Sequence, residues 1–389
     1  MNTPFLLALA AATSLACAGA PAQALQAPEI AARQYILLDL STGQTLAERD
    51  ADTPTDPASL TKLMTAYIVF CALRDKKLDL QQPTAVSVRA WNERKGDPSL
   101  MFIDTTMRPS VDELLHGMIV QSGNDAAVAL AEAVAGSVEA FVAMMNRQAA
   151  AWGLKNTAFK NVAGLTEAGH KISARDVAVI AAHIIRDFPQ YYPYYSIKEW
   201  TFNKIRQDNR NLLLRRDPTV DGMKTGFTDA AGYCLVASAA REYPNLGPAN
   251  KRRLLSVVMG TASREARANE SQKLLNWGYQ AFDPVKLFEA GKAIATPEVW
   301  KGRERRVNLG SETAVVIAVP RGEADKLQTR IERTEPLVAP LAKGQRVGTL
   351  KVTTAAGAPV AEVPLLVLEA VEQAGIFGRA WDAVRLWIR

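Results

Sequence analysis

The chain has 389 residues, more than one domain usually needs, and its hydrophobic content of 48% is ordinary for a globular protein. Its formal net charge of +6 would attract an anionic membrane surface or an anionic polymer, although a solvated basic surface explains the charge equally well. After the N-terminal segment, no apolar run reaches the roughly 18 residues of a membrane-spanning helix, so none is expected later in the chain.

The first 24 residues predict a secretory signal peptide. An apolar core at 5–12 is followed by small residues at Ala22 and Ala24, as at a signal cleavage site. The segment departs from the usual pattern because its first four residues contain no Lys or Arg. We expect cleavage near Ala24, export of the mature chain and, for an exported protein, no nucleic-acid partner.

The next part of the chain predicts an α/β sandwich of the α+β kind, with a helical block inserted between the strands of one antiparallel sheet. A hairpin is expected at 35–48, because two strand-like runs flank a turn that contains Gly43. Ser110 with Glu113 resembles a capping box, and Ser173 is expected to cap another helix. The expected helices are 114–119, 125–135, 138–152, 177–185 and 263–282, and the expected later strands are 199–202, 232–239 and 253–259.

Ser59 and Lys62 form the first candidate catalytic pair. Asp56 and Pro57 precede an apolar run and suggest a helix start. Residues three apart share a helix face, so the hydroxyl would lie beside the amine. A serine becomes a nucleophile when a neighbouring base, such as a desolvated lysine, accepts its proton. Alone the pattern is weak, since a solvated helix start with an incidental lysine also explains it.

Ser122 and Asn124 form the second candidate, a hydroxyl and an amide two residues apart after an apolar stretch. Both could line a cleft if Gly123 permits a tight turn. The alternative is a helix N-cap, because Ser and Asn are strong caps and a helix is expected from Asp125.

Lys224, Thr225 and Gly226 form the third candidate, at the end of a loop that enters an edge strand. Gly226 would let a substrate backbone approach closely, and the lysine and the hydroxyl could bind a carboxylate. An exposed strand lysine is the alternative. Each motif is weak alone, but the order Ser-x-x-Lys, Ser-x-Asn, Lys-Thr-Gly is much stronger, because a closely similar set occurs in β-lactamases and penicillin-binding proteins.

Residues 284–371 predict a small all-β domain with a spacer or docking role. Short strands are expected at 305–309, 313–319, 344–353 and 360–368. No catalytic constellation occurs in this segment.

Residues 372–389 predict an amphipathic helix, Gly375–Arg389, that anchors the chain to a membrane surface. An aromatic-rich apolar face opposite arginines is typical of a helix that lies in a membrane interface. A helix docked on its own protein is the alternative. The apolar face comprises Ile376, Phe377, Ala380, Trp381, Val384, Trp387 and Ile388, and the opposite side comprises Arg379, Asp382, Arg385 and Arg389.

Cysteine and histidine usage predicts neither a disulfide framework nor a metal site. Cys71 and Cys234 are far apart and are expected to be buried thiols. No Cys/His cluster has metal-ligand spacing, so we expect no metal and no cofactor.

Taken together, four segments make the chain resemble the D-alanyl-D-alanine carboxypeptidases, low-molecular-mass penicillin-binding proteins of the bacterial periplasm. The matching segments are 56–65, 121–126, 153–157 and 220–226. The resemblance covers essentially the whole mature chain. It implies a β-lactamase/transpeptidase-like catalytic domain at 25–283, and a periplasmic protein attached peripherally to the outer face of the inner membrane.

The resemblance also implies a role for each matching residue. Ser59 would attack the carbonyl between the two D-alanines of a peptidoglycan pentapeptide stem, and Lys62, kept neutral by burial and by the charge of Lys224, would accept its proton. β-Lactam antibiotics would react with the same serine as covalent inhibitors. Ser122 and Asn124 would continue the proton path and hold the peptide. The substrate carboxylate would be bound by Lys224, Thr225 and Arg210. Gly226 belongs to the same substrate-binding motif.

Three alternatives remain open beside the carboxypeptidase. A DD-endopeptidase would share all three motifs. A class A β-lactamase would need a further glutamate to activate water, but 156–160 contains no carboxylate and the nearest is Glu167. A non-catalytic wall-binding protein could keep the scaffold. One residue departs from the family pattern: Phe227 follows Lys-Thr-Gly, where many relatives carry histidine.

Overall fold

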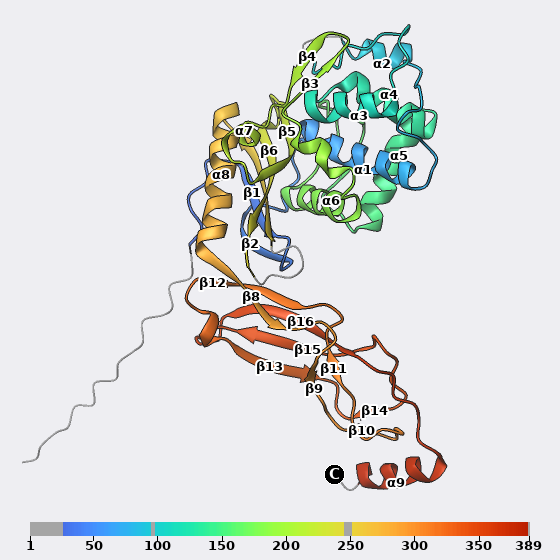
Figure 1. Ribbon diagram of the computed structural model, residues 1–389, viewed down its shortest axis with the longest axis vertical. Helices are drawn as coiled ribbons and strands as arrows, with labels where there is room; N and C mark the ends of the chain where they lie inside the picture. Colours follow the sequence, from blue (N-terminus) through green and yellow to red (C-terminus); the bar gives the residue numbers. More distant parts are fainter. Residues whose placement is uncertain (1–25, 95–97, 245–250, 388–389) are drawn as a thin grey trace, which may run out of the picture.

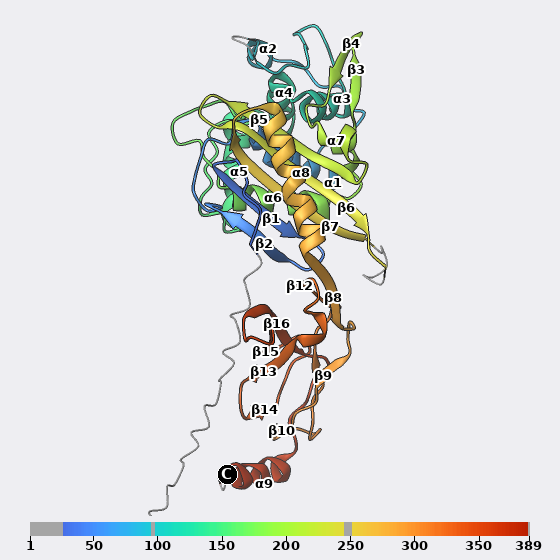
Figure 2. The same cartoon turned by 90° about the vertical axis from the view of Figure 1, so that its left-hand side faces the viewer.

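The computed structural model describes residues 26–94, 98–244 and 251–387. The molecule is elongated, with a mixed α/β part at one end, an all-β part beyond it and helix α9 (Ile376–Trp387) at the far end (Figures 1 and 2). The predicted signal peptide lies outside the described residues.

A five-stranded antiparallel sheet in the order β2-β1-β7-β6-β5 forms the centre of the α/β part. Its strands are β1 (Gln34–Asp39), β2 (Gln44–Arg49), β5 (Val220–Thr228), β6 (Gly232–Glu242) and β7 (Lys251–Thr261). The predicted hairpin and the strands predicted at 232–239 and 253–259 are confirmed. The strand predicted at 199–202 is β3 (Glu199–Phe202), but it pairs with β4 (Ile205–Asp208) in a separate hairpin.

Helices cover both faces of the central sheet (Figures 1 and 2). Because side chains alternate along a strand, Leu37 and Leu254 pack in one apolar cluster with Leu275 of α8, whereas their neighbours Ile36 and Leu255 join the larger cluster of the helical block. The helices are α1 (Thr61–Arg74), α2 (Val88–Asn92), α3 (Val111–His116), the π-helix η2 (Gly117–Gln121), α4 (Asn124–Ala135), α5 (Val138–Ala151), α6 (Ala174–Asp187), η3 (Tyr192–Ser196), α7 (Leu213–Arg216) and α8 (Arg264–Ala281).

Helix α1 is the buried axis of the helical block. Every residue of α1 except Cys71 and Arg74 is buried, and a helix that is apolar on all sides belongs in a core. The predicted capping box of Ser110 and Glu113 is confirmed at the start of α3, as is the Ser173 cap of α6. The packing therefore fixes the N-terminus of α1 where the helical block meets the sheet.

The all-β part begins with β8 (Phe282–Phe288), directly after α8. Its other strands are β9 (Ala293–Ala295), β10 (Val299–Trp300), β11 (Leu309–Gly310), β12 (Val315–Pro320), β13 (Gln328–Arg333), β14 (Leu337–Val338), β15 (Arg346–Thr353) and β16 (Pro359–Val367). The prediction of an all-β domain is confirmed. The strand predicted at 305–309 is wrong except at Leu309, because Arg306 makes only an isolated bridge with Glu298.

Side-chain contacts join the two parts. The Gln44 side chain donates to the carbonyls of Ala318 and Val360 at 3.2 and 3.0 Å, and its oxygen accepts the Ala318 N–H at 2.6 Å. Arg252 is fully buried, pairs with Asp39 at 2.7 Å and donates to the Phe282 carbonyl. The Gln44 contacts hold the turn of the first hairpin against the all-β part. The Arg252 contacts hold the start of β7 against the first residue of β8.

Helix α9 touches the all-β part through polar side chains. Asp382 accepts the Lys301 N–H at 2.7 Å, and the Arg385 guanidinium lies 5.2 Å from the centre of the Trp300 ring. The apolar side chains of Phe377 and Trp387 are 92% and 88% exposed. Among the described residues no single helix has the length and apolar character to span a bilayer, and only α4 with α5, bent by 83°, passes that test as a pair.

Candidate active site

The candidate nucleophile lies on a strained turn just before α1. Ser59 belongs to the 3-10 turn η1 (Ala58–Leu60), whereas Lys62 lies in the first turn of α1. Ala58 has a left-handed φ of +46°, and Gly164 packs against it so closely that a Cβ on Gly164 would lie 1.8 Å from the Ala58 carbonyl oxygen. The loop around Gly164 therefore holds the Ser59 turn in place.

Lys62 meets three oxygen atoms in the interior. Its Nζ lies 3.0 Å from Ser59 Oγ, 2.8 Å from Asn124 Oδ1 and 2.6 Å from the Ala163 carbonyl oxygen. The two carbonyl-type oxygens can only accept hydrogen bonds, so they take the two N–H groups of a neutral amine. The remaining lone pair then faces the Ser59 hydroxyl.

The environment of Lys62 favours this neutral form. Burial is the largest cause that lowers its pKa, from 10.5 to about 7, and the positive charge of Arg210 lowers it further. The carboxylates of Glu93 and Asp125 act in the opposite direction. Burial lowers the pKa of Lys62, as expected. The positive charge that lowers this pKa further is that of Arg210, not that of Lys224.

Ser122 and Asn124 sit where η2 passes into α4. Ser122 itself adopts the left-handed conformation, with φ of +70°, whereas Gly123 has a φ of −56°. The expectation that Gly123 supplies the unusual backbone angle is therefore wrong. Gly123 is needed for space instead, because a Cβ there would lie 2.8 Å from Asp125 Oδ1 and 2.9 Å from the Met101 nitrogen.

Lys224 completes a second lysine–serine pair. It is buried within β5, and its Nζ donates to Ser122 Oγ at 2.8 Å and to the Thr225 carbonyl at 3.1 Å. Burial, then the charges of Lys62 and Arg210, holds its pKa well below the usual value. The structure thus brings together Ser59, Lys62, Ser122, Asn124 and Lys224.

Thr225 and Gly226 lie in the middle of edge strand β5, not at the loop end that the sequence suggested. A Cβ on Gly226 would lie 3.1 Å from Ala58 Cβ and 3.4 Å from the Ser59 nitrogen. Gly226 therefore lets β5 approach the turn of the nucleophile within the chain itself.

Arg210 is exposed and lines the cleft, in the loop between β4 and α7. Its backbone is held by Arg267, which donates to the Arg210 carbonyl at 3.4 Å and to the Gly226 carbonyl at 3.1 Å. The sequence analysis missed Arg267. Its position in the sequence could have identified it. Ser271 and Leu274 follow Arg267 by four and seven residues, so all three lie on the buried side of α8, and a buried charged residue needs partners.

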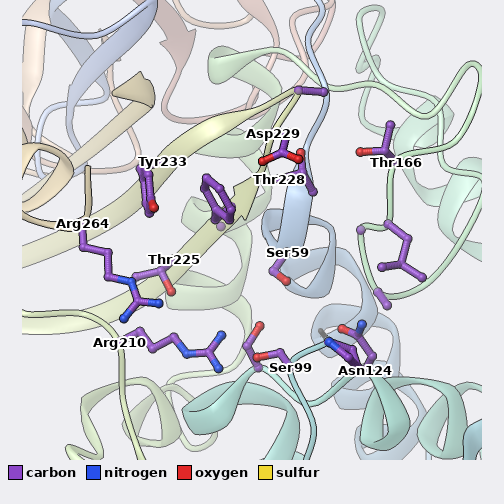
Figure 3. Close-up of a pocket in the computed structure, with 18 of the residues that line it drawn as sticks. Ser59, Ser99, Asn124, Thr166, Arg210, Thr225, Thr228, Asp229, Tyr233 and Arg264 are labelled. Carbon is purple, nitrogen blue, oxygen red and sulfur yellow. The ribbon is translucent and has the colours of Figure 1, made fainter. Parts of the chain in front are cut away.

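Ser59, Ser122, Asn124, Arg210, Thr225 and Gly226 line one open cleft of about 720 Å³, shown in Figure 3, whereas Lys62 and Lys224 are buried behind its surface. Ser59 lies near its middle, Arg210 and Arg264 lie to its left, Thr166 lies to its right, and Asp229 lies above it beside Thr228. Further lining residues that the sequence analysis did not single out are Pro98, Ser99, Ala163, Leu165, Thr166, Thr228, Asp229, Ala230, Tyr233 and Arg264. No group of His, Cys, Asp or Glu among the described residues could hold a metal ion.

Comparisons with known proteins identify this arrangement. Residues 21–263 match the family model described as D-alanyl-D-alanine carboxypeptidase, and residues 282–373 match the penicillin-binding protein 5 C-terminal domain. The chain is 44% identical to the D-alanyl-D-alanine carboxypeptidase DacC of Escherichia coli, with 94% of this chain and 90% of the relative covered. It is 33% identical to DacF of Bacillus subtilis over 88% of this chain and 87% of the relative.

Solved structures agree with the sequence comparison. Penicillin-binding protein 5 of Haemophilus influenzae superposes with a TM-score of 0.84 at 43% identity, covering 90% of this chain and 100% of that one. Penicillin-binding protein D2 of Listeria monocytogenes, solved with ampicillin, has a TM-score of 0.57 at 29% identity over 65% of this chain and 98% of that one. The chain therefore belongs to the serine-type D-alanyl-D-alanine carboxypeptidase family of penicillin-binding hydrolases.

Proposed function

We propose that this carboxypeptidase releases the terminal D-alanine of peptidoglycan pentapeptide stems through an acyl-enzyme on Ser59. The observation that carries the assignment is the position of Lys62 Nζ, whose lone pair is left facing Ser59 Oγ by two acceptor oxygens. In the acylation step the Ser59 oxygen bonds to the carbonyl carbon of the penultimate D-alanine, and its proton passes to Lys62.

The tetrahedral intermediate needs donors for its negative oxygen. The backbone N–H groups of Ser59 and of a residue on β5 are the candidates, because Gly226 brings that strand against the Ser59 turn. Collapse of the intermediate breaks the peptide bond, and the departing D-alanine amine takes up a proton. Ser122, linked to Lys224 at 2.8 Å, lies on the path for this proton, and water then hydrolyses the ester.

The substrate carboxylate would bind at the cationic side of the cleft. Thr225 and Arg210 line it there, and the buried amine of Lys224 contacts the Thr225 carbonyl. β-Lactams carry a carboxylate and a reactive carbonyl in a similar relation, and penicillin-binding protein D2 of Listeria monocytogenes has been solved in ampicillin-bound and cefotaxime-bound forms. We expect the same covalent reaction at Ser59.

The β-lactamase alternative would need Glu167 to activate water, because it is the carboxylate nearest to 156–160. Glu167 is exposed, does not line the cleft, and accepts a hydrogen bond from Asn161 Nδ2 at 3.1 Å. Slow release of a bound penicillin is therefore expected.

We also propose that the chain is exported and is held on the outer face of the inner membrane. This location is supported by the signal-like N-terminal sequence and by α9, whose polar side chains contact the all-β part while Phe377 and Trp387 are exposed. The α/β part, which contains Ser59, and α9 lie at opposite ends of the elongated molecule (Figure 1), so an anchored molecule would present Ser59 to the wall above the membrane.

The test of the function is to incubate the mature protein with a pentapeptide muropeptide and, separately, with a cross-linked dimer, and to identify the products by mass. Loss of one alanine from the pentapeptide, with the dimer intact, is expected. Splitting of the dimer in preference to alanine release would assign the chain to the endopeptidases, and a protein that a fluorescent penicillin fails to label at Ser59 would be a non-catalytic wall-binding protein.

A further inference from the structure

We infer that Asp229 forms a subsite for a free side-chain amine on the stem residue that precedes the two D-alanines. The inference rests on the proposed function, because the reaction at Ser59 fixes which way the peptide runs through the cleft. It adds a requirement on the acyl part of the substrate, which the three catalytic motifs do not specify.

The charges that line the cleft are separated. Arg210, Arg264, Arg267 and Asp229 all line the cleft. Figure 3 draws Arg210 and Asp229 on different sides of Ser59, with Arg210 below it and Asp229 above it. A peptide that places its terminal carboxylate among the arginines therefore has its acyl part directed toward Asp229. Thr166 lies across from Asp229 in Figure 3 and, with Leu165, also lines the cleft, which leaves a channel for an extended chain.

The distances along β5 suit this residue of the stem. Gly226 lies beside the Ser59 nitrogen, and Asp229 follows three residues later, just past the end of the strand. At about 3.3 Å per residue, this corresponds to a span of about 10 Å. An extended peptide alongside an edge strand advances by the same distance per residue. The residue before the two D-alanines therefore lies short of Asp229. A side chain as long as that of lysine can cross the remaining gap.

Asp229 is free to pair and is held on a fixed turn. Within the described ranges its carboxylate has no hydrogen bond or ion pair. The cationic Arg33 side chain, from the residue before β1, donates to the Ala230 carbonyl at 2.8 Å. The Thr228 hydroxyl accepts the Ala231 N–H and donates to Asp56 Oδ1, both at 3.0 Å. The turn is thus tied to the chain on both sides of Asp229, and Asp56 adds a second negative charge nearby.

An aspartate in a turn can also be there only for its turn-forming preference. The two explanations differ in what happens when the substrate amine is removed. If Asp229 only forms the turn, kcat/KM does not depend on the substrate amine. If Asp229 is a subsite, kcat/KM is higher for the substrate with the free amine, and this preference weakens as salt screens the exposed ion pair.

Two tripeptides test the subsite: Nα-acetyl-lysyl-D-alanyl-D-alanine, with a free ε-amine, and its Nε-acetyl derivative. For the wild-type chain at low ionic strength we expect kcat/KM for D-alanine release to be about threefold higher with the free amine, the scale of one exposed ion pair. The preference should shrink in about 0.5 M salt. Asp229→Asn should lower kcat/KM for the free-amine peptide until the two values coincide, and Asp229→Lys should favour the acetylated peptide.

Asp325→Asn, which changes an exposed carboxylate in the all-β part, is the matched control and should keep the wild-type preference. Thermal melting checks that each variant folds. Equal kcat/KM values for the two peptides with the wild-type chain, or a preference that survives Asp229→Asn, would overturn the subsite. Absence of D-alanine release from either peptide would instead contradict the proposed function.

Discussion

The amine of Lys62 lies 3.0 Å from the hydroxyl of Ser59, and its other two partners are oxygens that can only accept hydrogen bonds. This relationship requires a lysine that can lose its proton. Lys62→Arg places a permanently charged group there, so we expect the rate of Ser59 acylation by a fluorescent penicillin to fall by about 100-fold or more.

The control for this variant is folding, followed by circular dichroism and thermal melting. Lys62→Met removes the buried amine, and with it the base, and should be equally slow while remaining folded. Acylation of either variant at close to the wild-type rate would remove Lys62 from the role of base.

The pH dependence of acylation follows from the lowered pKa of Lys62. Below about 7 the amine holds its proton and cannot accept another, so the acylation rate should rise as the pH passes through that value. The same shift affects stability: between about 7 and the usual lysine value the unfolded chain binds the proton and the folded chain does not, so the contribution of Lys62 to stability rises with pH there. A penicillin acylation rate that stays flat from about pH 5.5 to about pH 9 would contradict this assignment.

Gly164→Ala should damage the site more than its backbone angle alone predicts. Gly164 has a φ of +91°, and a Cβ there would meet the Ala58 carbonyl oxygen at 1.8 Å, so the Ser59 turn must move. Gly169→Ala in the same loop is the matched control, since its φ is +79° but the nearest atom is the flexible Lys160 side chain at 3.2 Å. We expect the control to lose about 1 kcal/mol of unfolding free energy, and Gly164→Ala to lose more and to acylate slowly.

Chemical denaturation and penicillin labelling of the two glycine variants measure these effects. If both variants lost the same stability and kept full acylation, the loop around Gly164 would not be what holds the Ser59 turn.

Membrane attachment is predicted to depend on the apolar side of α9. Replacing Phe377, Trp381 and Trp387 by serine should abolish co-sedimentation of the mature chain with vesicles that contain anionic lipid, without changing D-alanine release from a soluble peptide. Val88→Ser, at an exposed apolar residue of α2 in the α/β part, should bind vesicles like the wild type. Undiminished binding of the triple variant would mean that another surface makes the attachment.

The local features of the site could be predicted from the sequence. The three-residue spacing of Ser59 and Lys62, the Ser110 capping box and the alternating strands of the sheet depend on neighbours in the chain. Features that depend on tertiary contacts were missed. The left-handed Ser122 and the Ala163 carbonyl on Lys62 become visible only once distant segments have packed together.

The same distinction explains what the sequence did not show about two glycines. Gly123 was wrongly expected to supply the backbone angle of a turn, and Gly226 was expected to admit a substrate; the structure shows that a segment of the chain also passes against each of them. Sequence identifies such a glycine without showing what it approaches. The strand at 199–202 was likewise predicted to join the main sheet, but it pairs with β4 in a separate hairpin. The pattern of a strand does not show which strand it pairs with.

The central claim is that Ser59 carries the acyl group during removal of the terminal D-alanine. The most direct test is to quench the mature chain during turnover of a pentapeptide, digest it, and locate the adduct by mass spectrometry. We expect a tetrapeptidyl ester on the peptide that contains Ser59, formed together with released D-alanine, and neither product in Ser59→Ala. D-Alanine release that continues in Ser59→Ala, or an adduct on another residue, would contradict it.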